Sequence, residues 1–281
     1  MTTIRKHRQA LSVCSAARII LVIVVAAAPL VLVAAPPAYT AATVENGGSV
    51  SGKALFTGER PESKFKTITK DVETCGEGDR EFDITTISDD NEMKDVVVYI
   101  AKIKEGKSWP EQDGPYVLEQ EKCAFHPKDY VVRRGAELQV FNKDKVSHNI
   151  HTYEIVGRAR ITMFNSGQPA GSDFSKPLTL RRPNSHAIKL ECDLHNFMHA
   201  WMFAADNPYY SVTTADGSFS IADIPPGKYK FVAWHPVLGE QKKFLEIAAG
   251  ENTEHSFTFK SKKKKKKKAP AAVKTEAPEQ P

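Results

Sequence analysis

The sequence lacks several features that would assign it to a common functional class. Beyond residue 35 no apolar run is long enough to span a membrane. There is no C-x-x-C-H motif, which excludes a c-type haem, and no basic groove interleaved with aromatic residues, which argues against nucleic-acid binding. No Ser/His/Asp arrangement or isolated carboxylate pair stands out, so nothing in the sequence supports an enzyme.

The first 42 residues predict a secretory signal. A basic segment without acidic residues is followed by the apolar run Ile19–Ala35 and then by small residues. The alternative is an uncleaved membrane anchor, because this run is at the short end of the spanning range. In both cases the rest of the chain is expected outside the cytoplasm, in the periplasm or cell envelope.

The net charge of +5 comes from the two ends of the chain. Removing the four basic residues of the signal and the seven lysines of Lys262–Lys268 leaves about −6 for the remainder. The tail, residues 261–281, combines this lysine run with Ala, Pro and Glu, a composition that predicts disorder. It is expected to be a solvated end; adhesion to anionic lipid or cell-wall polymer is the alternative.

Cysteines are few, and their number is informative. Cys14 precedes the apolar run and would leave with the signal, so three cysteines remain. An odd number in an exported protein indicates one special thiol. The most economical assignment is a disulfide between Cys75 and Cys123, which oxidising surroundings allow. Cys192 is then free, and a metal would protect it from oxidation.

The residue pattern after the signal predicts an all-β fold. Short alternating segments are separated by turn signals such as Asp216-Gly217 and Pro225-Pro226-Gly227. The segment Ile188–Cys192 alternates cleanly, which places the Cys192 sulfur on the buried face. The only helical piece expected lies near Ser63–Asp71. Short strands with regular turns are typical of β-sandwiches.

Two short segments carry the chemistry. The segment "KLECDLHNFMHAWM" places Cys192, His195 and Met198 at C-x-x-H-x-x-M spacing, and "SHNIH" supplies His148 upstream. Two imidazoles, a thiolate and a weak axial thioether are the donors that suit a redox copper site. A backbone N–H of Asn149 could hydrogen-bond the Cys192 sulfur and tune it.

Each of these residues also has a structural interpretation. Cys192 could be a buried inert thiol, since free cysteine packs as a small hydrophobic residue. Met198 could be a core residue, with Met202 or no residue in the axial position. His199 is expected to be a hydrogen-bonding or surface residue, although His199 and Met202 are both alternative ligands. A zinc site would need another ligand within reach.

The two segments together resemble the blue-copper cupredoxins, and the short loop is most similar to that of amicyanin. The resemblance covers about residues 116–206. It implies a Greek-key β-sandwich and a one-electron carrier. It also implies a single copper ion that cycles between Cu(I) and Cu(II), with four ligands: His148, Cys192, His195 and Met198.

A second resemblance concerns the regions on either side. "DGSFSIADIPPGKYKFVAWHP" resembles the carboxypeptidase regulatory-like domain, a transthyretin-like β-sandwich, and "GGSVSGKALFTG" is similar to its first strand. We therefore expect residues 43–115 and 207–260 to form one sandwich that is interrupted by a copper domain at 116–206. Two sandwiches in tandem are the alternative.

The predicted function is electron transfer between transient redox partners. His195 is expected to be the ligand nearest solvent, with Phe197 and Trp201 forming an apolar docking rim. Copper sequestration or delivery is an alternative that His199 and Met202 favour. A non-enzymatic envelope adhesion module is another, because the regulatory-like regions and the lysine tail would suit it.

Overall fold

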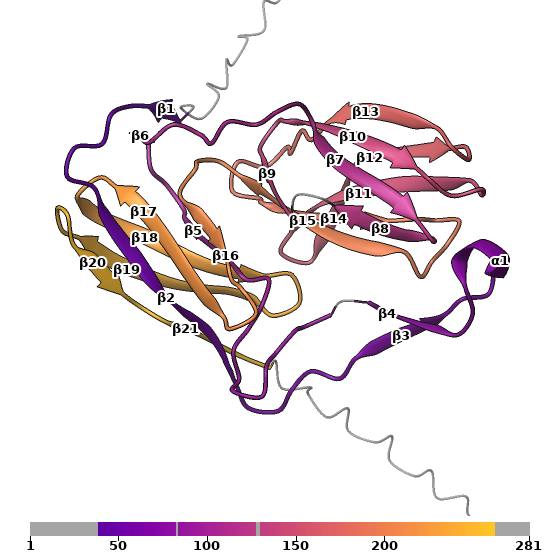
Figure 1. Cartoon of the computed structure of the whole chain (residues 1–281), viewed down its shortest axis with the longest axis horizontal. Coiled ribbons are helices and arrows are strands. Elements are labelled where there is room, and N and C mark those ends of the chain that lie inside the picture. The colour runs from indigo at the N-terminus through magenta and orange to yellow at the C-terminus, as the bar shows by residue number, and fades with distance from the viewer. Residues whose placement is uncertain (1–38, 83, 128–129, 262–281) are drawn as a thin grey trace, which may run out of the picture. The chain divides into compact units, whose positions relative to one another are not determined.

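The computed structural model describes residues 39–82, 84–127 and 130–261 (Figure 1). Most of the predicted signal and all of Lys262–Lys268 lie outside these residues. The fold is all-β, as predicted, and within the described ranges the one α-helix is α1 (Val72–Cys75). The helix expected near Ser63–Asp71 is wrong, because β3 (Lys64–Thr67) occupies that stretch. No helix of the described residues is long and apolar enough to cross a membrane.

Residues 116–205 form a sandwich of two sheets, here called the central sandwich. Its first sheet has the strand order β13 (Asp173–Pro177), β10 (Glu137–Asn142), β7 (Tyr116–Glu121), β8 (Ala124–Pro127). Its second sheet has the order β12 (Ala159–Gln168), β11 (His148–Val156), β14 (Ala187–Glu191), β15 (His199–Ala205), β9 (Val131–Arg133). This is the two-sheet architecture that the alternating segments predict.

The core of the central sandwich follows from the alternation of its strands. In β14, Ile188 and Leu190 are fully buried, whereas Lys189 and Glu191 between them are partly exposed. The buried residues join one hydrophobic cluster with residues of the facing sheet, including Leu138. Cys192 continues the buried face beyond the strand, as the period of two requires.

A second sandwich, here called the flanking sandwich, is built from strands on both sides of the central one. One sheet has the order β16 (Tyr210–Val212), β5 (Val97–Ile100), β18 (Gly227–His235), β19 (Gly239–Ile247). In the other, β2 (Gly48–Thr57) pairs with β17 (Ser218–Ile224), β20 (Asn252–Glu254) and β21 (Phe257–Lys260). A separate hydrophobic cluster fills the space between these sheets. A short parallel pair, β1 (Thr40–Ala41) with β6 (Glu105–Gly106), lies outside both sandwiches.

Residues 64–82, here called the cap segment, pair as a hairpin of β3 with β4 (Asp79–Phe82), with α1 between the strands (Figure 1). The predicted boundaries place this segment with the flanking sandwich. However, Ile68 and Cys75 belong to the hydrophobic cluster of the central sandwich. The cap segment therefore packs on the sandwich that carries the candidate ligands.

His235, at the end of β18, gives the fold an acid-sensitive element. The ring is 2 % exposed, and burial lowers its pKa from 6.5 to about 4. The His235 ring of the unfolded chain therefore binds a proton below pH 6.5, whereas the ring of the folded chain binds one only below about pH 4. We expect the free energy of unfolding to fall by on the order of 3 kcal/mol across this window because of this residue.

The His235→Asn variant should lose this contribution. An Asn side-chain oxygen can accept the backbone N–H groups of Val237 and Leu238, which the ring Nδ1 accepts at 3.2 and 3.4 Å in the native protein. Denaturant unfolding from pH 7.5 to 3.5 measures the difference between the two proteins. Parallel curves for the native protein and the variant would contradict the prediction.

Candidate metal centre

Two neighbouring strands and one tight loop position the predicted ligands. His148 is the first residue of β11, and Cys192 directly follows β14. These two strands are paired in the sheet. His195 and Met198 lie in the loop that connects β14 to β15. The Cys192 N–H donates to the Met198 carbonyl at 3.3 Å, and the Met198 N–H to the His195 carbonyl at 2.9 Å. These bonds close the loop and turn its side chains toward β11.

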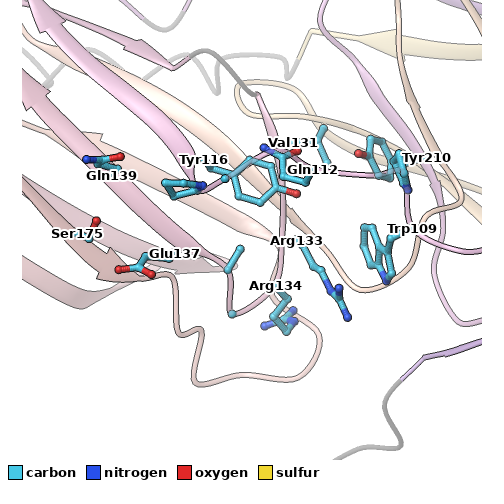
Figure 2. Close-up of a pocket in the computed structure, with 15 residues that line it drawn as sticks. Trp109, Gln112, Tyr116, Val131, Arg133, Arg134, Glu137, Gln139, Ser175 and Tyr210 are labelled. Atoms are coloured by element: carbon cyan, nitrogen blue, oxygen red, sulfur yellow. The ribbon is translucent and has the colours of Figure 1, made fainter.

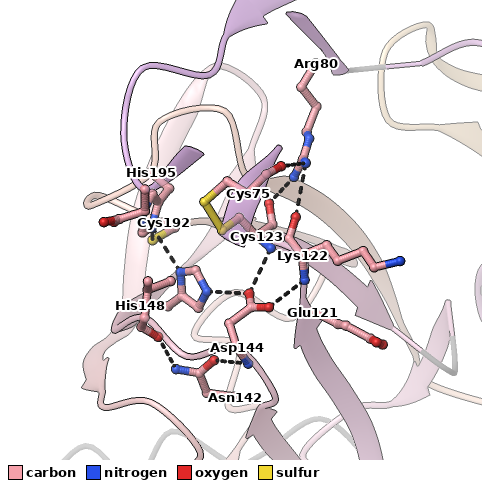
Figure 3. The surroundings of a disulfide bond; sticks show 12 residues. Cys75, Arg80, Glu121, Lys122, Cys123, Asn142, Asp144, His148, Cys192 and His195 are labelled. Atoms are coloured by element: carbon pink, nitrogen blue, oxygen red, sulfur yellow. Dashed lines mark hydrogen bonds and ion pairs between the residues drawn. A yellow bond between two sulfur atoms is a disulfide. The ribbon is translucent and has the colours of Figure 1, made fainter. Parts of the chain in front are cut away.

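Three of the four predicted ligands meet at one point (Figure 3). The Nδ1 atoms of His148 and His195 are 3.0 Å apart, and the Cys192 sulfur is 3.7 Å from the Nδ1 atom of His195. All three donor atoms lie within 4.8 Å of one another. The three residues are at most 2 % exposed, so water has little access to the donors.

Each imidazole is held at its other nitrogen by a carboxylate. The Nε2 atom of His148 is 2.8 Å from an Asp144 oxygen, and the Nε2 atom of His195 is 2.7 Å from an Asp71 oxygen. The two oxygens of Asp144 also accept the backbone N–H groups of Lys122 and Cys123, at 2.6 and 2.8 Å. Such a carboxylate accepts hydrogen bonds only, so it assigns the imidazole proton to Nε2.

This assignment leaves two nitrogen lone pairs pointing at each other. With both protons on Nε2, neither Nδ1 atom has a hydrogen to share across the 3.0 Å between them. Burial also lowers the pKa of His148, which keeps its ring neutral despite Asp144. A cation bound by both nitrogen lone pairs and by the sulfur would give all three atoms a partner. The donor set therefore fits a metal ion, and its two imidazoles and one thiol fit copper.

The Cys192 sulfur is buried and lies close to several hydrogen-bonding groups. Burial raises the pKa of the thiol, although backbone N–H groups of Asn149, His195 and Leu194 oppose this shift. The side-chain oxygen of Asn149 is 3.4 Å from the sulfur, and it also accepts the N–H groups of Asp193 and Leu194. The side chain of Asn149 therefore anchors the ligand loop next to the sulfur.

The remaining sulfur and imidazole candidates differ in position. Met198 is 1 % exposed and shares the hydrophobic cluster of Cys192. Met202 is a core residue of β15, opposite Ile188. His199 bonds the Asn196 carbonyl at 2.8 Å and packs against the Phe82 ring, so it does not join the three converging donors.

The predicted docking rim is wrong for Phe197. This side chain is 2 % exposed, and the Arg80 guanidinium of the cap segment lies 5.4 Å from its ring centre. Trp201 is partly buried in a cluster that includes residues of the flanking sandwich. His195 is 1 % exposed, because the cap segment places Asp71 over its outer edge. The exposed apolar residues next to these positions are Leu194, at 44 %, and Val72, at 42 %.

The predicted disulfide between Cys75 and Cys123 is confirmed, and among the described cysteines Cys192 alone is free. Two other groups of close donor atoms in the described residues include a sulfur of this disulfide. A sulfur in a disulfide cannot form the thiolate that binds a metal ion. The group formed by His148, Cys192 and His195 is therefore the one composed entirely of available ligands.

A groove of about 760 Å³ lies elsewhere on the chain (Figure 2). None of the candidate ligands lines it. Its two arginines already have partners: the Arg133 guanidinium lies 5.0 Å from the Trp109 ring centre, and Arg134 pairs with Asp206. The size of this groove therefore does not make it the functional site.

Sequence reasoning missed both carboxylates. Asp144 stands four residues before His148, and this spacing in "DKVSH" is a local signal that could have suggested the pair. Asp71 lies 124 residues before His195, and nothing near either residue indicates the contact.

Comparisons with known proteins give limited results. No known family matches the sequence, and no curated protein does. Among solved structures, a P52G mutant of amicyanin is 18 % identical, with 34 % of this chain and 87 % of that chain covered and a TM-score of 0.27. A purple cupredoxin from Nitrosopumilus maritimus is 18 % identical, with 32 % and 99 % covered and a TM-score of 0.27.

A copper-containing nitrite reductase from Thermus scotoductus is 13 % identical, with 36 % of this chain and 25 % of that chain covered and a TM-score of 0.26. Likenesses at this level carry no argument about function, which rests on the side chains described above. None of the comparisons supports the resemblance of the flanking sandwich to the carboxypeptidase regulatory-like domain.

Proposed function

We propose that this chain is an exported type 1 copper protein that carries one electron between redox partners. It would bind a single copper ion through His148, Cys192, His195 and Met198. The observation that carries the proposal is the buried meeting point of two imidazole lone pairs and one free thiol. Neutral imidazole and thiolate are ligands that copper accepts in both of its common oxidation states.

A bound copper ion supplies reversible one-electron oxidation and reduction. The chain's own residues keep the surroundings of that ion constant. Strands β11 and β14 fix His148 and Cys192 on adjacent rows of one sheet, and Asn149 anchors the loop that carries His195 and Met198. Because rigid donors move little when the charge changes, little reorganisation accompanies electron transfer.

The geometry favours a carrier over copper sequestration or delivery. A delivered ion must enter and leave, whereas these ligands are at most 2 % exposed and are covered by the cap segment. The extra donors that favoured sequestration, His199 and Met202, do not converge on the same point. The envelope adhesion alternative explains neither the buried donors nor the free thiol.

A redox partner would approach the surface closest to His195. Leu194 precedes this ligand, Val72 follows the aspartate that bonds it, and both are exposed apolar residues. Small apolar patches of this kind suit short-lived complexes. We propose Leu194 and Val72 for the docking role that the sequence assigned to Phe197 and Trp201.

Export is proposed from the signal-like first 42 residues together with the disulfide. Disulfides persist in oxidising compartments such as the periplasm, and the Cys75–Cys123 bond is present in the folded chain. Contact with membrane or cell wall through the N-terminal segment or Lys262–Lys268 is a further proposal that rests on the sequence alone.

Titration of the purified, reduced and metal-free protein with Cu(II) tests the function. We expect an intense blue colour that saturates at one copper ion per chain, and a reversible one-electron midpoint in voltammetry. A colourless product after titration would overturn the proposed site. Colour without reversible cycling would favour the sequestration alternative.

A further inference from the structure

The cap segment is fastened to the central sandwich at several independent points (Figure 3). The disulfide joins Cys75 to Cys123. Arg80 donates to the backbone carbonyl of Lys122 at 3.0 Å and to that of Cys123. The Lys66 ammonium donates to the Asn196 carbonyl of the ligand loop at 2.9 Å. The cap segment therefore has a defined position over this loop.

Asp71 is the cap residue that contacts the candidate centre. It stands directly before α1, where an aspartate side chain commonly caps the first N–H groups of a helix. Here the side chain makes no capping bond, and its carboxylate instead lies 2.7 Å from the Nε2 atom of His195. The backbone of Asp71 has a φ of 50°, a left-handed conformation that few residues adopt easily. The turn therefore directs this carboxylate toward the imidazole.

The contact completes a symmetric arrangement. His148 is held by Asp144, which belongs to the central sandwich, and His195 is held by Asp71, which belongs to the cap segment. Both carboxylates place the imidazole proton on Nε2 and direct the Nδ1 lone pair inward. The second of them comes from outside residues 116–206. The centre is therefore incomplete without a part of the chain that precedes the central sandwich.

We propose that Asp71 is a positioning residue for His195, and this inference rests on the proposed function. Its carboxylate fixes the Nε2–H tautomer, orients the ring and adds a negative charge close to the metal. Partners of this kind typically contribute 10- to 100-fold to metal affinity. The added charge stabilises Cu(II) more than Cu(I), so its removal should raise the midpoint potential.

Three variants test this assignment. Asp71→Ala removes the acceptor, and Asp71→Asn removes the charge but retains an acceptor. Glu73→Gln is the matched control, because Glu73 is an exposed residue of α1 and its change alters the charge equally. Near-ultraviolet circular dichroism of each protein establishes that the fold is retained before the centre is studied.

The first measurement needs no metal. In the reduced, metal-free native protein, ¹⁵N spectra of the imidazoles should show His195 with its proton on Nε2. In Asp71→Ala the proton should move to Nδ1, where it can be donated across the 3.0 Å to His148. Asp71→Asn should lie between these states, and Glu73→Gln should match the native protein. An unchanged tautomer in Asp71→Ala would overturn the inference.

The second measurement uses the copper-loaded protein. Asp71→Ala should bind Cu(II) 10- to 100-fold more weakly, and a tenfold loss at unchanged Cu(I) affinity corresponds to a midpoint about 59 mV higher. A midpoint equal to that of Glu73→Gln would also overturn the inference. If the native protein stays colourless with copper, the proposed function fails, whereas the metal-free tautomer experiment still decides the role of Asp71.

Discussion

Replacing Cys192 with serine should abolish the blue colour of the copper-loaded protein. The colour is expected from charge transfer between a thiolate and Cu(II), and a serine hydroxyl cannot supply a thiolate. The loss should be essentially complete rather than partial. The fold should survive, because the serine hydroxyl can donate to the Asn149 oxygen that lies 3.4 Å from the native sulfur. Visible spectra at equal copper and protein concentrations measure the effect.

Met198→Gln is the matched control in the same loop. It retains the thiolate and both imidazoles, so the protein should stay coloured while its midpoint potential shifts. If Met202→Gln moved the potential and Met198→Gln did not, the axial assignment would pass to Met202. A Cys192→Ser protein that kept its full colour would show that the chromophore lies elsewhere.

Removal of the disulfide should be the most destabilising of these changes. The Cys75–Cys123 bond closes a loop with a sequence separation of 48. The chain-entropy estimate for a loop of this length is about 4 kcal/mol of stability. We expect the double variant Cys75→Ser, Cys123→Ser to lose about this much free energy of unfolding in denaturant titrations followed by far-ultraviolet circular dichroism.

The same variant should also alter the candidate centre. With the disulfide gone, the cap segment loses its covalent link to the central sandwich and keeps only noncovalent contacts, such as the hydrogen bonds of Arg80 and Lys66, so the contact of Asp71 with His195 should weaken. The midpoint of the copper-loaded variant should then shift toward that of Asp71→Ala. A loss of stability below about 1 kcal/mol would show that the remaining hydrogen bonds suffice to hold the cap segment.

The parts of the site that the sequence predicts are those with short, regular spacing. The alternation of Ile188–Cys192 places the sulfur on the buried face, and burial of 2 % agrees with it. The odd number of cysteines after the signal suggests one free thiol, and the structure leaves Cys192 unpaired. These features depend on strand periodicity and counting, which neighbouring residues determine.

The parts that sequence reasoning missed depend on contacts between distant segments. Asp71 contacts His195, 124 residues further along the chain, because the disulfide and Arg80 hold the cap segment over the ligand loop. The same coverage explains why Phe197 is buried instead of forming a docking rim. Local pattern gives no information about such coverage, since it says which face of a loop is apolar and not what covers it.

The strand order of the flanking sandwich also determines when each part of the protein can be completed. Strand β2 is made early, but its parallel partners β20 and β21 are among the final strands, with Ser49 and Asn252 separated by 203 residues. All strands of the central sandwich, in contrast, come from one continuous stretch. A chain that emerges from its N-terminus can therefore finish the ligand-bearing half first, while β2 gains its antiparallel partner β17 only afterwards and its other edge stays open to proteases and aggregation until β20 and β21 are made.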